Sequence, residues 1–332
     1  MKEILLAHGG GGEETRQLIE SLFVKHFGNP MLERLEDAAI ISGNPQLAFT
    51  TDSFTVSPLF FNGGNIGKLA VAGTVNDLAV MGARPLYLSS AFIIEEGFPL
   101  EHLQAIVAAM AEELQKSGAT IITGDTKVVP RGSADGLFIN TTGIGQVVYP
   151  GLSAGNVQPG DVLVASGTVG DHGACILAQR EGIELESDLQ SDCATLWPLI
   201  ETVLKAEIEI HAMRDPTRGG LAAVLNEWAT TSQVGMDIQE AAIPIRQEVM
   251  GLCELLGMEA TSLACEGRVV FAVPQPQAEA LLAVLHTHPL GRDAQIIGTV
   301  TSAHPGQVIL HTEYGARRIL EPPQGELLPR IC

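Results

Sequence analysis

Four aspartates in the first half of the chain lie at the ends of expected strands or among small apolar neighbours. They occur in the stretches "EDAAI", "TTDSF", "TVNDLAV" and "TGDTKVV", as Asp37, Asp52, Asp77 and Asp125. Asp77 is the most informative, because an unpaired carboxylate within an apolar helix is costly. Any one of them could cap a loop, and Asp77 could pair with Arg84, but four in one half favour a Mg²⁺ site that holds a polyphosphate.

The stretch "RDPTRGGLAAVLNE" is a second candidate for phosphate binding. It places charged and small residues immediately before an expected helix, where main-chain N–H groups attract anions. Its candidate residues are Arg214, Asp215, Thr217, Arg218, Gly219 and Gly220. An ordinary capping turn with a solvated ion pair explains this composition equally well. The glycine run in "HGGGGEET" also opens an expected helix, but it lacks the G-K-[ST] of a P-loop, so a flexible loop is the simpler interpretation.

Three residues in glycine-containing stretches could transfer protons. They are His172 in "SGTVGDHGA", Glu266 in "LACEGRVV" and Lys127 in "GDTKVV". A hydrogen-bonded loop histidine and surface charges are the ordinary alternatives. Glu266 and Lys127 are both expected where a strand meets a turn, one in each half of the chain, so they could converge on a cleft.

The other histidines and cysteines are less informative, except for the last residue. His286 and His288 do not share a helix face, so structural or surface roles are expected. Four cysteines lie in or near apolar segments and are expected to be inert buried thiols: Cys175, Cys193, Cys253 and Cys265. Cys332, in "GELLPRIC", lies outside any periodic segment. Residues 321–332 contain three prolines and one glycine without periodicity, which predicts a mobile tail that reaches roughly 40 Å when extended.

The expected elements divide the chain into two domains of mixed α and β structure. Helices are expected over 12–27, 64–83, 99–118, 173–181, 196–206, 219–231, 246–257 and 276–287. Strands are expected over 37–42, 46–54, 119–125, 136–148, 161–167, 267–273, 294–300 and 307–312. The loop "YPGLSAGNVQPGD" predicts a boundary, which gives domains over 1–150 and 151–320 and a tail over 321–332. Neither half has a regular βαβ rhythm, so the fold class is α+β.

Composition restricts the partners and the compartment. The formal net charge of −20 opposes binding to nucleic acid or to an anionic membrane, and it means that a bound nucleotide needs a cation. The apolar run Ile4–Ala7 is too short for a signal peptide, and no window reaches the length of a membrane span. No C-x-x-C pair is present, so a cytoplasmic protein with reduced thiols is expected.

Several stretches together resemble the AIR synthetase/selenophosphate synthetase (PurM-like) superfamily of ATP-using enzymes. The likeness runs through "LAHGGGG", "TDSF", "PLFFNGGNIGKLAVAGTVNDLAVMGA", "TGDTKVV", "SGTVGDHGA", "RDPTRGG" and "CEGRVV" to the final "PRIC", and so covers essentially the whole chain. Within the superfamily, the "PRIC" ending is similar to that of the HypE family of carbamoyl dehydratases, which act in hydrogenase maturation.

The resemblance implies a cytoplasmic homodimer that pairs through its N-terminal sheets and uses ATP and Mg²⁺. It implies metal ligands at Asp37, Asp52, Asp77 and Asp125, and nucleotide contacts from these residues and from Thr126, Arg214, Asp215, Thr217, Gly219 and Gly220. A carbamoyltransferase, HypF, would load a carbamoyl group onto Cys332. The chain would dehydrate this group to a thiocyanate, and a HypC–HypD complex would accept the cyanide for the iron of [NiFe]-hydrogenase.

This chemistry needs a base, a metal and a mobile substrate carrier. Glu266, with Lys127, is the expected proton acceptor at the carbamoyl nitrogen, and the amide of Asn76 is expected to orient the carbamoyl group. Two alternatives remain. Another reaction of the superfamily, such as amide activation or selenophosphate synthesis, would make Cys332 incidental. A nickel or iron carrier would use Cys332 and the histidines without catalysis.

Overall fold

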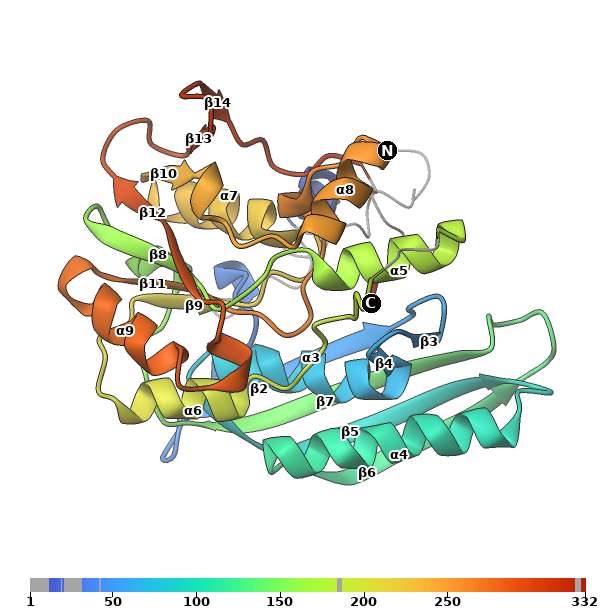
Figure 1. Cartoon of the computed structure of the whole chain (residues 1–332). Coiled ribbons are helices and arrows are strands. Elements are labelled where there is room, and N and C mark those ends of the chain that lie inside the picture. The colour runs from blue at the N-terminus through green and yellow to red at the C-terminus, as the bar shows by residue number, and fades with distance from the viewer. Residues whose placement is uncertain (1–11, 19, 21–31, 42, 184–186, 326–329) are drawn as a thin grey trace.

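The chain folds around two β-sheets that lie one above the other in Figure 1. The computed structural model describes residues 12–18, 20, 32–41, 43–183, 187–325 and 330–332. The helices are α1 (Glu13–Leu18), α3 (Ile66–Val80), α4 (Leu100–Ser117), α5 (Asp171–Glu181), α6 (Trp197–Lys205), α7 (Gly220–Ser232), α8 (Gln247–Leu256) and α9 (Ala278–Leu285). No helix in the described ranges is long and apolar enough to cross a membrane. The expected α+β class is confirmed.

The first sheet has five strands in the order β1-β2-β7-β5-β6. Its strands are β1 (Ala39–Ile41), β2 (Leu47–Phe54), β5 (Ala83–Glu95), β6 (Thr120–Val129) and β7 (Leu137–Val147). Only the pair formed by β5 and β6 is parallel, and α4 connects these two strands. Strand β6 therefore forms one edge of the sheet.

The second sheet has seven strands in the order β14-β13-β10-β12-β8-β11-β9. Its strands are β8 (Asp161–Ala165), β9 (Ala212–Arg214), β10 (Gly235–Gln239), β11 (Val270–Pro274), β12 (Gln295–Thr301), β13 (Val308–His311) and β14 (Arg317–Ile319). The loop over 148–160, where a domain boundary is expected, connects the two sheets. A short hairpin of β3 (Phe60–Phe61) and β4 (Gly64–Asn65) precedes α3.

Helix α3 connects the two halves of the molecule. It packs on β2 and β7 of the first sheet and also on α6 and β9 of the second half. Almost every one of its residues is buried, which explains its composition of small residues. At Gly67 a Cβ atom would lie 2.3 Å from the Ile106 carbonyl oxygen, so only glycine permits this approach to α4. One apolar cluster consequently contains residues from both sheets.

Some elements differ from the sequence prediction. Strand β5 was not predicted, because Pro85 near its start indicates a break, but the proline lies at a bulge where the chain tolerates it. The short strands β9, β10 and β14 were also not predicted. The strand that was expected to end at Asp125 continues to Val129. Of the helix expected over 12–27, the described part is α1 and Glu20, and the glycine run before it lies outside the described residues except for Gly12.

The end of the chain docks against the body of the protein. Ile331 is 5% exposed within the apolar cluster, and Cys332 packs against that cluster. Figure 1 shows the C-terminus between α5 and the β3–β4 hairpin, above α3. A single docked position does not test whether the tail moves, so the mobile tail stays a prediction.

Candidate functional site

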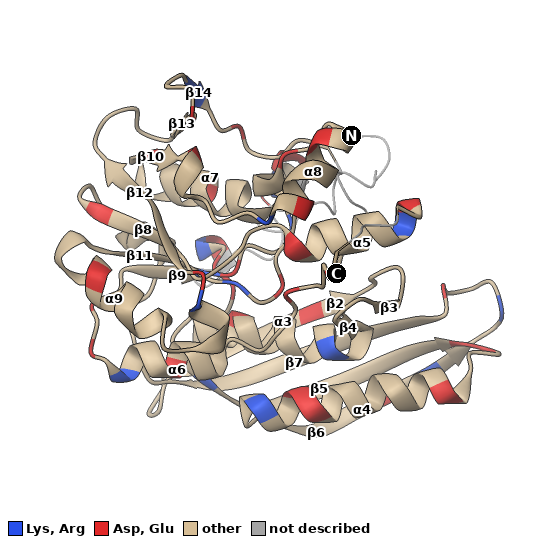
Figure 2. Cartoon of the chain, in the orientation of Figure 1, with Lys and Arg blue, Asp and Glu red and all other residues tan. Residues whose placement is uncertain are grey.

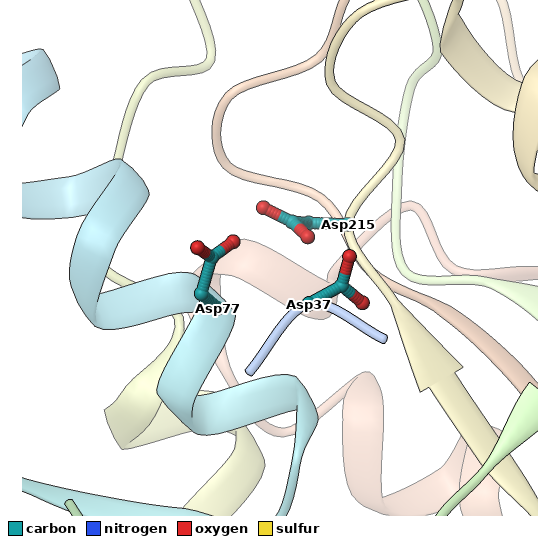
Figure 3. A group of neighbouring side chains, drawn as sticks. All are labelled: Asp37, Asp77 and Asp215. Atoms are coloured by element: carbon teal, nitrogen blue, oxygen red, sulfur yellow. The ribbon is translucent and has the colours of Figure 1, made fainter. Parts of the chain in front are cut away.

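Three carboxylates from distant parts of the sequence converge between the two halves. Asp37 precedes β1, Asp77 lies in α3, and Asp215 follows β9. Figure 3 shows their side chains pointing toward one another, and one oxygen of each lies within 4.8 Å of the others. We call Asp37, Asp77 and Asp215 the acidic cluster.

The acidic cluster concentrates negative charge in a poorly hydrated place. Burial, followed by repulsion from Asp37, raises the pKa of Asp215 to about 8. Burial also raises the pKa of Asp37, to about 6, although the positive charge of Arg214 acts in the opposite direction. Burial and the charges of its neighbours raise the pKa of Asp77 well above its ordinary value, although Thr50 donates a 2.7 Å hydrogen bond to Asp77 Oδ2. A donor set made only of carboxylate oxygens fits Mg²⁺, whose charge would offset this repulsion.

Two arginines lie beside the acidic cluster. Arg214 forms a 3.0 Å ion pair with Asp37 and a 2.9 Å ion pair with Glu227. Arg218 interacts with Asp52 and with Cys332. Burial raises the pKa of Asp52, on β2, and the positive charge of Arg218 acts in the opposite direction. Figure 2 shows acidic and basic residues together where α3, β2 and β9 approach one another.

Cys332 brings a thiol to this charged region. Burial raises the pKa of the thiol to about 12, and the next contributions are the negative charge of Glu266 and the opposing positive charge of Arg218. The charges of Asp52 and Asp215 also act on the thiol. The docked tail therefore places a protonated, half-buried thiol at the edge of the acidic cluster.

Glu266 is a fully buried carboxyl group, which contradicts the interpretation as a surface carboxylate. It is 1% exposed, and its Oε1 has no hydrogen-bond partner among the described residues. Burial, then the charges of Asp215 and Asp192, raise its pKa well above the ordinary value. A buried carboxyl group with one free oxygen next to a thiol is typical of a functional site.

Asp125, Thr126 and Lys127 lie elsewhere in the single chain. They occupy the interior of β6, at the edge of the first sheet, rather than the strand end that was expected. Asp125 and Lys127 are exposed and form a 2.7 Å ion pair with each other. Lys127 is not among the largest contributions to the pKa of Glu266 or of Cys332. Within one chain, the structure does not bring these three residues to the acidic cluster.

Asn76 is already engaged in three hydrogen bonds. Its Nδ2 donates to the carbonyl oxygens of Ala194 at 3.1 Å and of Glu266 at 3.2 Å. Its Oδ1 accepts a 2.7 Å bond from the Leu196 N–H. Asn76 thus fixes the loop that carries Glu266 to α3, and an additional contact to a carbamoyl group stays a prediction.

The "RDPTRGG" loop begins at Arg214 and ends in the first turn of α7. Gly219 and Gly220 both have positive φ angles, of 80° and 61°. A Cβ atom at Gly220 would lie 2.5 Å from the Leu263 carbonyl oxygen, so the loop packs closely on the segment before Glu266. The loop places Asp215 in the acidic cluster, whereas nucleotide contacts from Thr217, Gly219 and Gly220 stay predictions.

Other expected residues have the structural roles that were anticipated. His286 Nε2 bonds to the Ala294 carbonyl oxygen, and His288 Nδ1 accepts from the Leu290 N–H. The cysteines other than Cys332 are buried free thiols. Arg84 pairs with Glu201 and not with Asp77.

Sequence reasoning missed several residues that contribute to the site. Asp215 was not expected among the metal ligands, although it belongs to the acidic cluster, and its contact with the nucleotide stays a prediction. Thr55, Arg180 and Ser191 were not considered, although they help to hold the tail or His172. For the "GDHGA" stretch, the sequence offered an acid or base or a hydrogen-bonded loop histidine, and His172 is hydrogen-bonded through both ring nitrogens in the first turn of α5, to partners that the sequence did not identify.

Comparison with known proteins agrees with this architecture. Residues 35–147 match the AIR synthase related protein N-terminal domain, and residues 158–311 match the corresponding C-terminal domain. The chain is 51% identical over 336 residues to the carbamoyl dehydratase HypE of Rhodobacter capsulatus, covering 100% of this chain and 98% of the relative.

Solved structures show the same relationship. A crystal structure of a HypE–HypF complex aligns with a TM-score of 0.88 at 47% identity and covers 92% of this chain and 99% of that chain. A crystal structure of HypE in complex with ATP aligns with a TM-score of 0.84 at 46% identity and covers 99% of this chain and 100% of that chain. With this identity over its whole length and with both domains matched, the chain belongs to the HypE family of carbamoyl dehydratases within the AIR synthase related proteins.

Proposed function

We propose that this chain is an ATP-dependent carbamoyl dehydratase whose substrate is a carbamoyl group on its own Cys332. The observation that carries this proposal is the position of the Cys332 thiol, which lies within the electrostatic reach of Glu266, Arg218 and Asp215. The relatives are named carbamoyl dehydratases, and one of the similar structures contains ATP. A carbamoyl group on Cys332 would enter the site that contains the acidic cluster.

The reaction needs activation of the carbamoyl oxygen. The oxygen of S–C(=O)–NH₂ attacks the γ-phosphorus of ATP, and the bond from this phosphorus to the bridging oxygen breaks, releasing ADP. The two N–H protons are removed, the C–O bond breaks, and phosphate leaves with the former carbamoyl oxygen. The product is S–C≡N, so one carbamoyl group and one ATP yield one thiocyanate, ADP and phosphate.

Residues of the chain supply distinct parts of this chemistry. Asp37, Asp77 and Asp215 would hold Mg²⁺, which supplies positive charge that offsets the phosphate oxygens when ATP is bound. Glu266, with its free Oε1, is positioned to accept a proton from the carbamoyl nitrogen. Arg218 contributes positive charge where negative charge develops on the transferred oxygen.

A homodimer and partner proteins complete the proposal. Strand β6 is an edge strand whose outer side has no strand partner among the described residues, and it has exposed apolar side chains, Ile122 at 61% and Val128 at 67%, which suits pairing of N-terminal sheets. Pairing at this edge would give Asp125, Thr126 and Lys127 a route to the partner's site. HypF is the proposed source of the carbamoyl group, because a relative forms a complex with HypF. A HypC–HypD complex as the cyanide acceptor and a cytoplasmic location are further parts of the proposal.

The mass of the peptide that contains Cys332 tests the proposal. Incubation with the carbamoylating partner should add one carbamoyl group, and ATP with Mg²⁺ should then remove the mass of one water. With a heavy-oxygen label in the carbamoyl group, the label should appear in phosphate. The matched control is Cys332→Ser, which keeps the size of the side chain but removes the thiol.

Two outcomes would favour the alternatives. ATP hydrolysis that is stimulated by a free small molecule and persists in Cys332→Ser would indicate another reaction of the superfamily. Nickel or iron that remains after desalting without nucleotide would indicate a carrier.

A further inference from the structure

The protein holds one main-chain oxygen of each of the residues Arg330–Cys332. The Arg330 oxygen accepts from the Ser57 N–H at 3.1 Å and from the Arg180 guanidinium. The Ile331 oxygen accepts from His172 Nε2 at 2.8 Å. The Cys332 oxygen accepts from the Thr55 N–H at 2.9 Å and from the Thr55 hydroxyl at 3.2 Å.

None of these hydrogen bonds involves the sulfur of Cys332. Every one of these bonds is made to the main chain, so none depends on whether the sulfur carries hydrogen, a carbamoyl group or a cyano group. The Arg330 side chain adds a second anchor, because its Nε donates to the Thr55 carbonyl oxygen at 2.7 Å and its guanidinium lies 5.7 Å from the centre of the Phe138 ring. These main-chain and Arg330 contacts can therefore hold the tail before and after the reaction.

His172 holds the residue next to the cysteine, and its hydrogen bonds fix its tautomer. The Ile331 carbonyl oxygen can only accept, so Nε2 carries the proton and Nδ1 has none. Nδ1 then accepts from the Ser191 hydroxyl at 2.7 Å, and the Ser191 oxygen accepts from the Cys193 N–H at 3.0 Å. The ring is completely buried and packs edge-on against Phe61, so it has one orientation.

We propose that His172 is a positioning residue for the tail: its Nε2–H bond to the Ile331 carbonyl oxygen sets the place of Cys332 in the site, and Ser191 fixes the tautomer that makes this bond. The role in dehydration rests on the proposed function, whereas the docking role does not. The bond is one residue from the reacting sulfur, so its loss lets the sulfur move relative to Glu266. Lost alignment lowers the rate of a positioned reaction without lowering ATP binding.

Alkylation of Cys332 measures the docking directly in the unmodified protein. A docked thiol with a raised pKa reacts slowly with iodoacetamide, so the rate reports how often the tail leaves the site. Mass spectrometry of the peptide that contains Cys332 gives this rate separately from that of the buried cysteines. His172→Leu should raise the rate by about fivefold or more, which corresponds to the loss of one neutral hydrogen bond.

Two isosteric variants separate the Nε2 bond from a general packing role. In His172→Gln the amide nitrogen can occupy the position of Nε2 and donate to Ile331, so the rate should stay near that of the natural protein. In His172→Asn the amide nitrogen lies near the position of Nδ1 and does not reach Ile331, so the rate should rise as in His172→Leu. Ser191→Ala should give an intermediate rise, because the ring loses the donor that fixes its tautomer.

The same variants should slow dehydration in the same order. With carbamoylated protein, single-turnover dehydration should be slower in His172→Asn than in His172→Gln, at equal ATP affinity and equal melting temperature. Equal alkylation rates in folded His172→Gln and His172→Asn would overturn the proposal. If alkylation follows the predicted order but the carbamoylated natural protein is not dehydrated, the docking role stands and the proposed function fails.

Discussion

Glu266 is the charged group that acts most strongly on the thiol of Cys332. Its carboxyl group is fully buried, and the thiol is brought to it by three residues that follow a stretch of undescribed chain. Burial and neighbouring negative charge raise the pKa of both groups. In the docked state, the unmodified Cys332 thiol, with a pKa of about 12, therefore keeps its proton at neutral pH.

The raised pKa of Cys332 has a consequence for loading. A thiol with a pKa of about 12 is a poor nucleophile, because almost none of it is ionised at neutral pH. A carbamoyltransferase would also need access to a sulfur that is half-buried when docked. Loading is therefore expected on the undocked tail and dehydration on the docked tail.

The substitution Cys332→Ala should abolish carbamoylation while keeping the fold. The half-buried side chain packs against the margin of the apolar cluster, so its truncation should lower the free energy of unfolding by only about 1 kcal/mol or less. Intact mass after incubation with the carbamoylating partner measures modification, and thermal unfolding measures stability. A large drop in melting temperature, or a carbamoyl group that is still added elsewhere, would count against the carrier role.

Substitution in the acidic cluster should weaken Mg²⁺-dependent ATP binding. Asp77→Asn and Asp215→Asn each remove one carboxylate that would hold the cation, so ATP affinity with Mg²⁺ should fall while the weak affinity in EDTA changes little. Titration calorimetry in both conditions measures this difference. Asp237→Asn is a matched control, because Asp237 is an aspartate of the second sheet that pairs with His311 away from the cluster.

The role of Asp125 is tested in the same experiment. In a single chain its exposed carboxylate pairs with Lys127 on β6, so Asp125→Asn should affect ATP binding only if the first sheets of two subunits pair. Light scattering of the natural protein establishes whether dimers are present.

ATP affinity that is undiminished in Asp77→Asn and Asp215→Asn would contradict the metal site.

The stability of the metal-free protein should fall as the pH rises from about 6.5 to 8. The folded-state pKa of Asp215 is raised from 3.8 to about 8, so in this range the folded state binds a proton that the unfolded state does not. Stability from such a group is present at low pH and is lost as the pH passes through the folded-state pKa. The pH range begins at about 6.5 because folding lowers the pKa of His172 from 6.5 to about 4. Between these two pH values, His172 makes the stability rise with pH, which is opposite to the effect of Asp215.

Urea unfolding at several pH values measures this slope. Asp215→Asn should flatten it, because an amide does not titrate, and Mg²⁺ should reduce it by offsetting the negative charge of the acidic cluster. An equal slope in Asp215→Asn would assign the pH dependence to other groups.

Local patterns predicted most of the helices and the broad location of the site. The small residues of α3 and the spacing of α4 were sufficient for correct helix predictions, and the position of Asp77 inside α3 singled out a carboxylate that the structure places in the acidic cluster. Features that depend on tertiary contacts were harder to predict from the sequence. The bulge that accommodates Pro85 depends on the neighbouring strand β7, and the burial of Glu266 depends on the packing of its loop against α3 through Asn76.

The position of Lys127 also depends on a tertiary contact that the sequence did not predict. The "GDTK" stretch resembles a strand end, but parallel pairing with β5 extends the strand through Lys127 to Val129. This pairing places the ammonium group on an exposed edge, away from Glu266 in the same chain. The expected convergence of Glu266 and Lys127 therefore requires a second subunit, which no local sequence pattern specifies.

The substitution Glu266→Gln should slow dehydration while preserving ATP binding and carbamoylation of Cys332. Glutamine keeps the size of the side chain but removes the basic oxygen, so single-turnover dehydration should slow by roughly 10²–10⁴-fold, the usual contribution of a general base. The carbamoylated form should then accumulate in mass spectra. Stability should be unchanged or higher, because the burial that raises the pKa of Glu266 also penalises its ionised form.

Glu113→Gln supplies the matched control for this experiment. Glu113 is an equally buried glutamate, but it accepts from the Thr195 N–H at 2.8 Å and pairs with Lys116 at 2.7 Å, so it has structural partners. Its substitution should lower the melting temperature with little effect on the dehydration rate, the reverse of the pattern at Glu266. A dehydration rate in Glu266→Gln equal to that of the natural protein would remove Glu266 from the mechanism, and equal slowing in both variants would indicate a loss of packing rather than of a base.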